Sequence, residues 1–189
     1  MTPRALLVGA AFGAGLASLA WAYPEGSPWG AADPAADEHC ASCHWERQPV
    51  MASRALDLDG LPKRVTAGQE YVLTVTLTGT DAAVSGFQLI ASAEGQPAGR
   101  FKSADRDVES AAIGAQIRST ATRPTTGDMA RWRLVWRAPA KLDGPVTFHA
   151  AASAANDDGS PFGDQIHYRE FMREPLQRPK KKGPLAPKD

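Results

Sequence analysis

Glu70–Thr78 reads EYVLTVTLT, and this stretch decides the fold class. Its apolar and polar residues alternate without a break, and successive side chains of a β-strand point to opposite faces of the sheet. The face that we expect to be buried carries Tyr71, Leu73, Val75 and Leu77. The stretch therefore predicts a strand with one face in a core and one face in solvent.

The chain after Pro62 continues in the same way. Three further runs predict strands: Gly86–Ser92, Arg131–Arg137 and Pro145–Ala152. Weaker runs lie near Val65, near Phe101, at Ile113–Ile117 and at Ile166–Phe171. Turn signals such as Asp143-Gly144 separate the runs, and no long helical period interrupts them. The sequence thus predicts a mainly β protein, with an immunoglobulin-like antiparallel β-sandwich over residues 62–172.

Residues 23–61, which precede this sandwich, have a different composition. They are rich in Gly, Pro, Ala and Asp and lack a strand pattern. Asp33 is a good N-cap and Pro34 suits the first helical position, so we expect a short helix from Pro34 to about Gln48. This segment is interpreted as an arm, part helix and part loop, that leads into the sandwich.

The arm contains both cysteines of the chain, in the sequence Cys40-Ala-Ser-Cys43-His44. C-x-x-C-H is the pattern by which haem is covalently attached in c-type cytochromes. On one helical turn, each thiol can form a thioether to a haem vinyl group, and the imidazole of His44 can ligate the iron as the proximal ligand. We therefore predict one covalently attached haem c in a haem-binding arm. The alternatives are a structural or redox Cys40–Cys43 disulfide and a chance occurrence of the pattern.

The ligand on the other side of the iron is left open by the sequence. His167 is the first candidate, Met129 is the alternative, and an open or water-bound position is the third option. Weaker candidates are His39, His149, Met51 and Met172. Two strong protein ligands suit electron transfer, whereas an open position permits a small molecule to bind.

Two further groups of residues have both a functional and a structural interpretation. Trp29 and Trp45 flank the cysteine motif, where they either cover the haem or simply pack. An Asx-rich stretch suggests calcium binding, but its spacing is not that of an EF-hand loop and turns explain it more simply. Its members are Asn156, Asp157, Asp158 and Asp164.

Both ends of the chain lie outside the expected domain. Residues 1–22 predict a signal peptide, with Arg4 before an apolar run and a small-x-small cleavage site at Ala20-Trp21-Ala22. The alternative is an uncleaved membrane anchor, although the run is rich in Ala and Gly. Residues 173–189 hold six Lys or Arg and two acidic residues, a net charge of +4, among four prolines. We expect a disordered basic tail there, which either docks on an acidic surface or is merely solvated.

Short motifs in order along the chain resemble the reeler-type β-sandwich. They are Gly86–Leu89, Trp132, Trp136–Pro139, Gly144–Phe148, Ala155–Gly159 and Gly163–Ile166. Bacterial proteins similar to this type are often labelled choice-of-anchor V proteins, and many carry C-x-x-C-H just before the sandwich. The resemblance spans about residues 38–170 and implies an immunoglobulin-like fold with one N-terminal haem site in exported proteins. Such relatives commonly have a His-Thr pair where this chain has Arg118–Thr126, so no role of that His is carried over.

These observations favour an exported, periplasmic or otherwise extracytoplasmic monohaem c-type cytochrome that transfers single electrons. Its partners would be redox proteins, met singly or in a larger membrane or periplasmic assembly, and we expect no nucleic-acid partner. The alternatives are a haem-based small-ligand sensor or binding module, and an adhesion or assembly sandwich with an accessory haem. We do not expect an enzyme, because no nucleophile pattern, phosphate loop or metal-binding His pair stands out.

Overall fold

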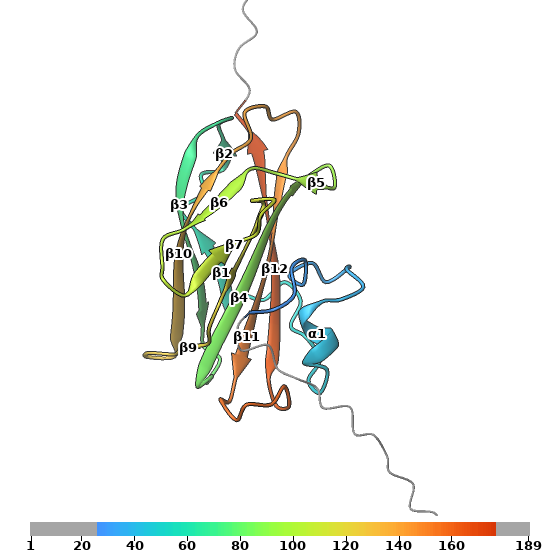
Figure 1. The fold of residues 1–189 in the computed structure, drawn as a ribbon, viewed down its shortest axis with the longest axis vertical. Helices are drawn as coiled ribbons and strands as arrows, with labels where there is room; N and C mark the ends of the chain where they lie inside the picture. The colour runs from blue at the N-terminus through green and yellow to red at the C-terminus, as the bar shows by residue number, and fades with distance from the viewer. Residues whose placement is uncertain (1–25, 177–189) are drawn as a thin grey trace, which may run out of the picture.

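The computed structural model describes residues 26–176, which form one short helix and a set of β-strands (Figure 1). The predicted signal peptide and cleavage site lie outside the described residues, as does the greater part of the predicted basic tail. No helix among residues 26–176 is long and apolar enough to cross a membrane. The elements are α1 (Cys40–Cys43), β1 (Leu56–Asp59), β2 (Arg64–Val65), β3 (Glu70–Thr78), β4 (Val84–Ala93), β5 (Gln96–Pro97), β6 (Arg100–Ser103), β7 (Val108–Ser110), β8 (Gln116–Ser119), β9 (Arg123–Pro124), β10 (Met129–Arg137), β11 (Val146–Ala155) and β12 (Gln165–Pro175).

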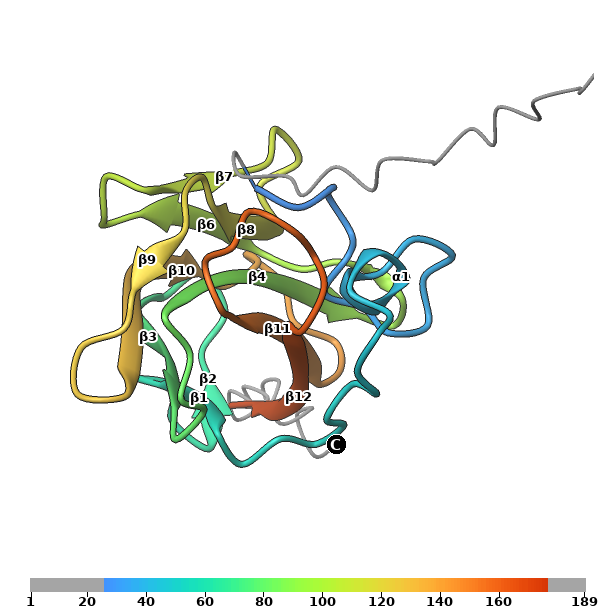
Figure 2. The same ribbon diagram turned by 90° about the horizontal axis from the view of Figure 1, so that it is seen from below.

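The strands form two sheets that face each other. One sheet has the order β1-β3-β10-β6, and the other runs β2-β12-β11-β4-β8-β7, with β5 and β9 paired to β4. The main pairs are antiparallel: β3 pairs with β10 from Glu70↔Arg137 to Thr78↔Met129, and β11 lies between β4 and β12. The end-on view in Figure 2 shows the two layers enclosing the interior. The predicted mainly β sandwich is confirmed.

The core forms where the alternating strands turn their apolar faces inward. All four residues of the predicted buried face of β3 are buried, whereas Val72, between them, is 67% exposed. Trp136 of β10 stacks on Tyr71 of its own sheet with ring centroids 6.0 Å apart. It also meets Phe148 of the opposite sheet edge to face at 4.8 Å. Aromatic contacts of this kind fix how the two sheets pack.

The arm packs on the outside of the larger sheet, where α1 lies beside β11 and β12 in both views (Figures 1 and 2). A small apolar cluster joins the arm to the sheet and is separate from the sandwich core. It comprises Ala32, Ala41, Ala151, Ile166 and Tyr168. Further along the arm, Val50 N donates to Ile166 O and Ser53 N donates to Tyr168 O, both at 2.8 Å. The arm therefore follows the edge of β12 as an additional extended segment.

Three predicted boundaries are corrected by the structure. The expected helix from Pro34 to Gln48 is only the single turn Cys40–Cys43: Ala35 N donates to Asp33 Oδ1 as at a helix start, but the residues that follow form only a turn and a bend. The arm was expected to contain no strand, but β1 lies within it and pairs with β3. The sandwich does not end at residue 172, since β12 continues through Arg173–Pro175 and pairs with β2.

Candidate functional site

The cysteine motif is presented on a single helical turn that the sheet holds in place. Cys40 N donates to Ala31 O at 3.1 Å, and His44 N donates to Cys40 O at 3.2 Å. Ala41 N donates to the hydroxyl of Tyr168, a β12 residue, at 3.1 Å. Backbone N–H groups at the start of a helix need such outside acceptors. The turn of α1 therefore depends on β12 for its position.

The strand β4 fixes the segment that leads into α1. Gln88 is 1% exposed, and its amide reaches the arm through both polar atoms. Oε1 accepts from Ala32 N at 2.8 Å, while Nε2 donates to Ser27 Oγ at 3.0 Å and to Pro28 O at 2.8 Å. These hydrogen bonds hold the arm against β4, because a buried amide group without partners would carry a desolvation cost.

A cavity of about 550 Å³ opens between the arm and the outer face of the larger sheet. Cys40, Cys43 and His44 all line it, together with Ser27 and Pro28 from the start of the arm. The sheet contributes mostly small side chains to the cavity, and the loop between β11 and β12 closes one side. These further lining residues include Gly86, Ala151, Ser153, Ala155, Asp157, Asp158, Gly159 and Ser160.

The residues around this cavity fit a covalently bound haem. Its volume lies within the range of about 300–1,000 Å³ that is usual for ligand and cofactor pockets. The wall formed by Gly, Ala and Ser leaves room for a flat macrocycle. Two thiols and one imidazole are the donor set that a c-type haem requires, and here they share one wall.

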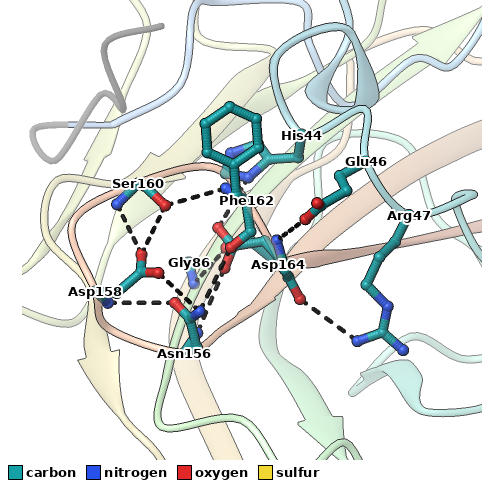
Figure 3. Close-up of polar contacts among 11 residues, drawn as sticks. His44, Glu46, Arg47, Gly86, Asn156, Asp158, Ser160, Phe162 and Asp164 are labelled. Carbon is teal, nitrogen blue, oxygen red and sulfur yellow. Dashed lines mark hydrogen bonds and ion pairs between the residues drawn. The ribbon is translucent and has the colours of Figure 1, made fainter.

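His44, the predicted proximal ligand, has a carboxylate partner. His44 Nδ1 lies 2.9 Å from Oδ2 of Asp164, whose side chain is only 3% exposed. His44 Nδ1 is itself buried, and although it lies close to Asp164, it makes no hydrogen bond of good geometry with any group in the part of the chain that the structure describes. Figure 3 shows this pair beside the loop between β11 and β12. The carboxylate comes from a position 120 residues further along the chain.

The residues that follow His44 contact the loop between β11 and β12. Glu46 Oε2 accepts a hydrogen bond from Gly163 N at 2.6 Å, and Arg47 donates to Gly163 O at 3.4 Å (Figure 3). The rings of Trp45 and Phe162 meet edge to face with centroids 5.8 Å apart. The loop that carries Asp164 is thus fastened to the segment that carries the predicted iron ligand.

The two cysteines differ in environment. Both are free thiols, so the structure does not contain the alternative Cys40–Cys43 disulfide. Burial raises the pKa of Cys40 to about 12, against a smaller lowering by the hydrogen bond with Tyr168. Burial likewise raises the pKa of the Tyr168 hydroxyl. Cys40 is therefore a protonated, weakly nucleophilic thiol at neutral pH, whereas Cys43 is exposed.

Neither predicted distal ligand is brought to the cavity. His167 lies on the face of β12 that also carries Phe171 of the core, and its Nδ1 is 2.8 Å from Ser53 Oγ. Burial lowers the pKa of His167, and the nearby charge of Arg47 lowers it further. Met129 begins β10 in the other sheet, where it pairs with Thr78. Neither residue is among those that line the cavity.

Of the weaker candidates, only His39 lines the cavity. Its Nδ1 lies 3.3 Å from the Tyr168 hydroxyl. His149 lies on β11 at 3.2 Å from Glu170, and Met51 and Met172 are exposed on the surface. Among the described lining residues, His39 and His44 are the two imidazoles, and there is no methionine.

The tryptophans and Asp158 of the Asx-rich stretch make structural contacts in the described residues. Trp29 lies under the guanidinium of Arg118 at 4.2 Å, and neither Trp29 nor Trp45 lines the cavity. Asp158 accepts hydrogen bonds from Ser160 in a local turn, and these bonds lower its pKa. Within residues 26–176, no group of three or more His, Cys, Asp or Glu side chains is placed to hold a metal ion. The hydrogen bonds of Asp158 with Ser160 agree with the interpretation of this part of the stretch as a turn.

Asp164, Gln88 and Tyr168 contact the cysteine motif or the arm, and the sequence does not indicate these contacts. Asp164 belongs to the Asx-rich stretch and to the Gly163–Ile166 motif, and neither indicates a histidine partner. Gln88, in the Gly86–Leu89 motif, and Tyr168 lie in strands whose patterns do not indicate a contact with the arm. All three act across more than 50 residues of chain. Only the pairing of the strands reveals them.

Comparison with known proteins supports the fold. The Reeler domain family model matches residues 40–157. A crystal structure of the human F-spondin reeler domain is 17% identical and covers 69% of this chain and 96% of that chain, with a TM-score of 0.49. The Reelin-N domain of F-spondin is 19% identical and covers 69% and 91%, with a TM-score of 0.51. Comparison with curated protein sequences gives no match. At such identities the structural likeness concerns the fold alone.

Proposed function

Because this chain belongs to the Reeler domain family and carries C-x-x-C-H where that domain begins, we propose that it is an exported monohaem c-type protein that transfers single electrons. The observation that carries the proposal is the shared cavity. Cys40, Cys43 and His44 line one space of about 550 Å³, between the arm and a sheet face of small side chains. A C-x-x-C-H pattern that arose by chance would not be expected to border a cavity of this size.

Each residue of the motif has a distinct part in this proposal. Cys40 and Cys43 hold the cofactor as thioethers, and His44 ligates its iron. The haem supplies the one-electron couple, while the protein supplies attachment, orientation and electrostatics. Tyr168 and Gln88 keep the attachment turn and the arm against the sheet. The exposure of Cys43 places the attachment wall at the surface, where a redox partner can approach.

Export is part of the proposal. The predicted signal peptide over residues 1–22 and the need for haem attachment outside the cytoplasm both support a periplasmic or other extracytoplasmic location. Electron transfer then requires redox partner proteins, either single ones or those of a larger assembly.

The first experiment is expression of the full chain in a host with cytochrome c maturation, followed by denaturing electrophoresis with haem staining. We expect the wild type to stain and the double variant Cys40→Ala/Cys43→Ala not to stain. Ser42→Ala, in the same helical turn, is the matched control and should keep the stain. If the wild type does not stain, or if the double variant retains haem through denaturation, the proposal is overturned.

A second candidate function, reversible binding of a small neutral ligand, is favoured by one observation. Besides His44, the only imidazole among the described lining residues is that of His39, and there is no methionine. His39 directly precedes Cys40, so a short tether opposes its reach to the far side of the same haem. An open iron position permits binding of carbon monoxide or nitric oxide.

Absorption spectra of oxidised and reduced protein, with and without carbon monoxide, distinguish the two candidates. A low-spin reduced spectrum that ignores the gas would support a six-coordinate electron carrier. A high-spin spectrum that shifts on adding the gas would support ligand binding. His39→Ala separates a third arrangement, because loss of a low-spin spectrum in this variant would identify His39 as the distal ligand.

A further inference from the structure

We propose that Asp164 is the positioning residue for the proximal imidazole: its carboxylate holds Nδ1–H of His44, presents Nε2 to the iron, and favours the oxidised state through its negative charge. The inference rests on the proposed haem attachment and deepens it. Its starting point is the 2.9 Å separation of His44 Nδ1 and Asp164 Oδ2.

Asp164 is buried, so its carboxylate needs a partner within the protein. Its side chain is 3% exposed, and a buried carboxylate is costly unless it is paired. Among the described residues, its other oxygen, Oδ1, accepts one long hydrogen bond, of 3.4 Å from Asn156 N. His44 is therefore the main partner of the charge, and the imidazole is in turn the group that the carboxylate orients.

The chemistry of histidine gives this contact its consequence. A neutral imidazole carries one proton, on either Nδ1 or Nε2, and the hydrogen bond of one nitrogen decides which nitrogen remains free to bind a metal. A carboxylate at Nδ1 selects the tautomer with a bare Nε2. Outer partners of this kind fix ring orientation and raise the basicity of the ligand. A more basic ligand and a nearby negative charge both stabilise the oxidised iron.

The surrounding contacts fix the position of Asp164 relative to His44. Gly163, immediately before Asp164, is held at its N–H by Glu46 and at its carbonyl by Arg47. Both side chains come from the segment that directly follows His44. The backbone of Gly163 has φ +81°, a left-handed conformation that other residues rarely adopt. Asp164 is thus fixed relative to the imidazole through the residue that precedes it.

The test compares two isosteric charge removals in the haem-loaded full chain. Asp164→Asn deletes the charge beside His44, while Asp157→Asn deletes a charge of the same loop that lines the cavity but makes no ion pair among the described residues. Asn also suits the left-handed backbone of Asp157, which has φ +65°. We expect Asp164→Asn to shift the reduction potential to a more positive value, and Asp157→Asn to shift it distinctly less. Equal shifts in the two variants, or no shift in Asp164→Asn, would overturn the inference.

A second readout does not need haem. Nitrogen NMR of the full chain without haem, recorded above about pH 8 where an ordinary imidazole is neutral, reports the tautomer of His44. We expect the Nδ1–H form in the wild type and a mixture of tautomers in Asp164→Asn. An Nε2–H form in the wild type would overturn the positioning role. Failure of the wild type to bind haem, with the Nδ1–H form present, would instead count against the proposed function alone.

Discussion

Ser53 Oγ lies 2.8 Å from Nδ1 of His167, within the part of the sandwich that is closed to solvent. His167, which the sequence favours as the distal ligand, therefore forms a hydrogen bond with a serine of the arm. Its neighbours in β12, Ile166 and Tyr168, point the other way and pack under α1. Alternation along one strand thus separates a structural histidine from the cavity by a single residue.

This relationship predicts the outcome of replacing His167. His167→Gln should leave the absorption spectrum of the haem-loaded protein unchanged, because the side chain does not line the cavity. Spectra of the oxidised and reduced variant, compared with wild type, check this. Loss of a low-spin spectrum in His167→Gln would restore His167 as the distal ligand.

The same histidine predicts a pH dependence of stability. Burial, and then the charge of Arg47, lower the pKa of His167 in the folded state. The unfolded chain therefore binds the proton more readily, and the stabilising effect of the neutral imidazole is present above about pH 6.5 and lost as pH falls through the folded pKa. Urea unfolding at about pH 7.5 and at lower pH should show a steeper loss for wild type than for His167→Gln. Equal losses in the two proteins would show that His167 does not carry the effect.

The substitution of His44 can be compared with that of His149. His44→Ala should still permit thioether formation at the two cysteines, but it removes the proximal ligand and should change the spin state and the reduced spectrum. His149→Ala should not, since His149 lies on β11 beside Glu170 and does not line the cavity. An unaltered spectrum in His44→Ala would remove His44 from the iron.

Gln88 tests how the arm is held. Gln88→Ala deletes three hydrogen bonds between β4 and the arm and leaves the buried Ala32 N without its acceptor. We expect a loss of unfolding free energy on the order of 1–3 kcal/mol, together with a lower yield of attached haem. Gln96→Ala, at an exposed position in β5, is the control and should lie within about 0.5 kcal/mol of wild type. Equal unfolding free energies of the two variants in urea would show that Gln88 does not hold the arm.

Leu134 tests the sandwich itself. Leu134 of β10 is fully buried between the sheets, and Leu134→Ala should cost about 2–5 kcal/mol of unfolding free energy. Val72→Ala, on the solvent face of the adjacent β3, provides a comparison at a position that is 67% exposed. We expect it to change stability by about 0.5 kcal/mol or less. Chemical denaturation of the three proteins measures the difference.

The strands that alternate strongly could be predicted with good accuracy. The predicted Arg131–Arg137 became β10, Met129–Arg137, and the predicted Pro145–Ala152 became β11, Val146–Ala155. Elements that depend on a partner were missed or misplaced. β1 is four residues long, too short for its own pattern to stand out, and exists because Leu56–Asp59 pairs with Leu77–Thr74. The predicted helix is only the turn Cys40–Cys43, and the acceptors of its first amides, Ala31 O of the arm and the Tyr168 hydroxyl of β12, could not be predicted from the local sequence.

The sequence by itself determined two things about this protein: a mainly β architecture, through the period-two pattern of strands such as Glu70–Thr78, and a candidate attachment site, through the spacing of Cys40, Cys43 and His44. Both are local, because a strand period and a helical turn are properties of neighbouring residues.

Only the tertiary structure decided which face of β12 looks outward. Its run of apolar residues at both parities, with Ile166 and Tyr168 on one face and Phe171 on the other, does not reveal the buried side. The pairing of β12 with β11 decides which face is turned toward the core, and His167 lies on that face. The loop that precedes β12 brought Asp164 to His44, since contacts between residues more than 100 positions apart arise only when distant segments pack.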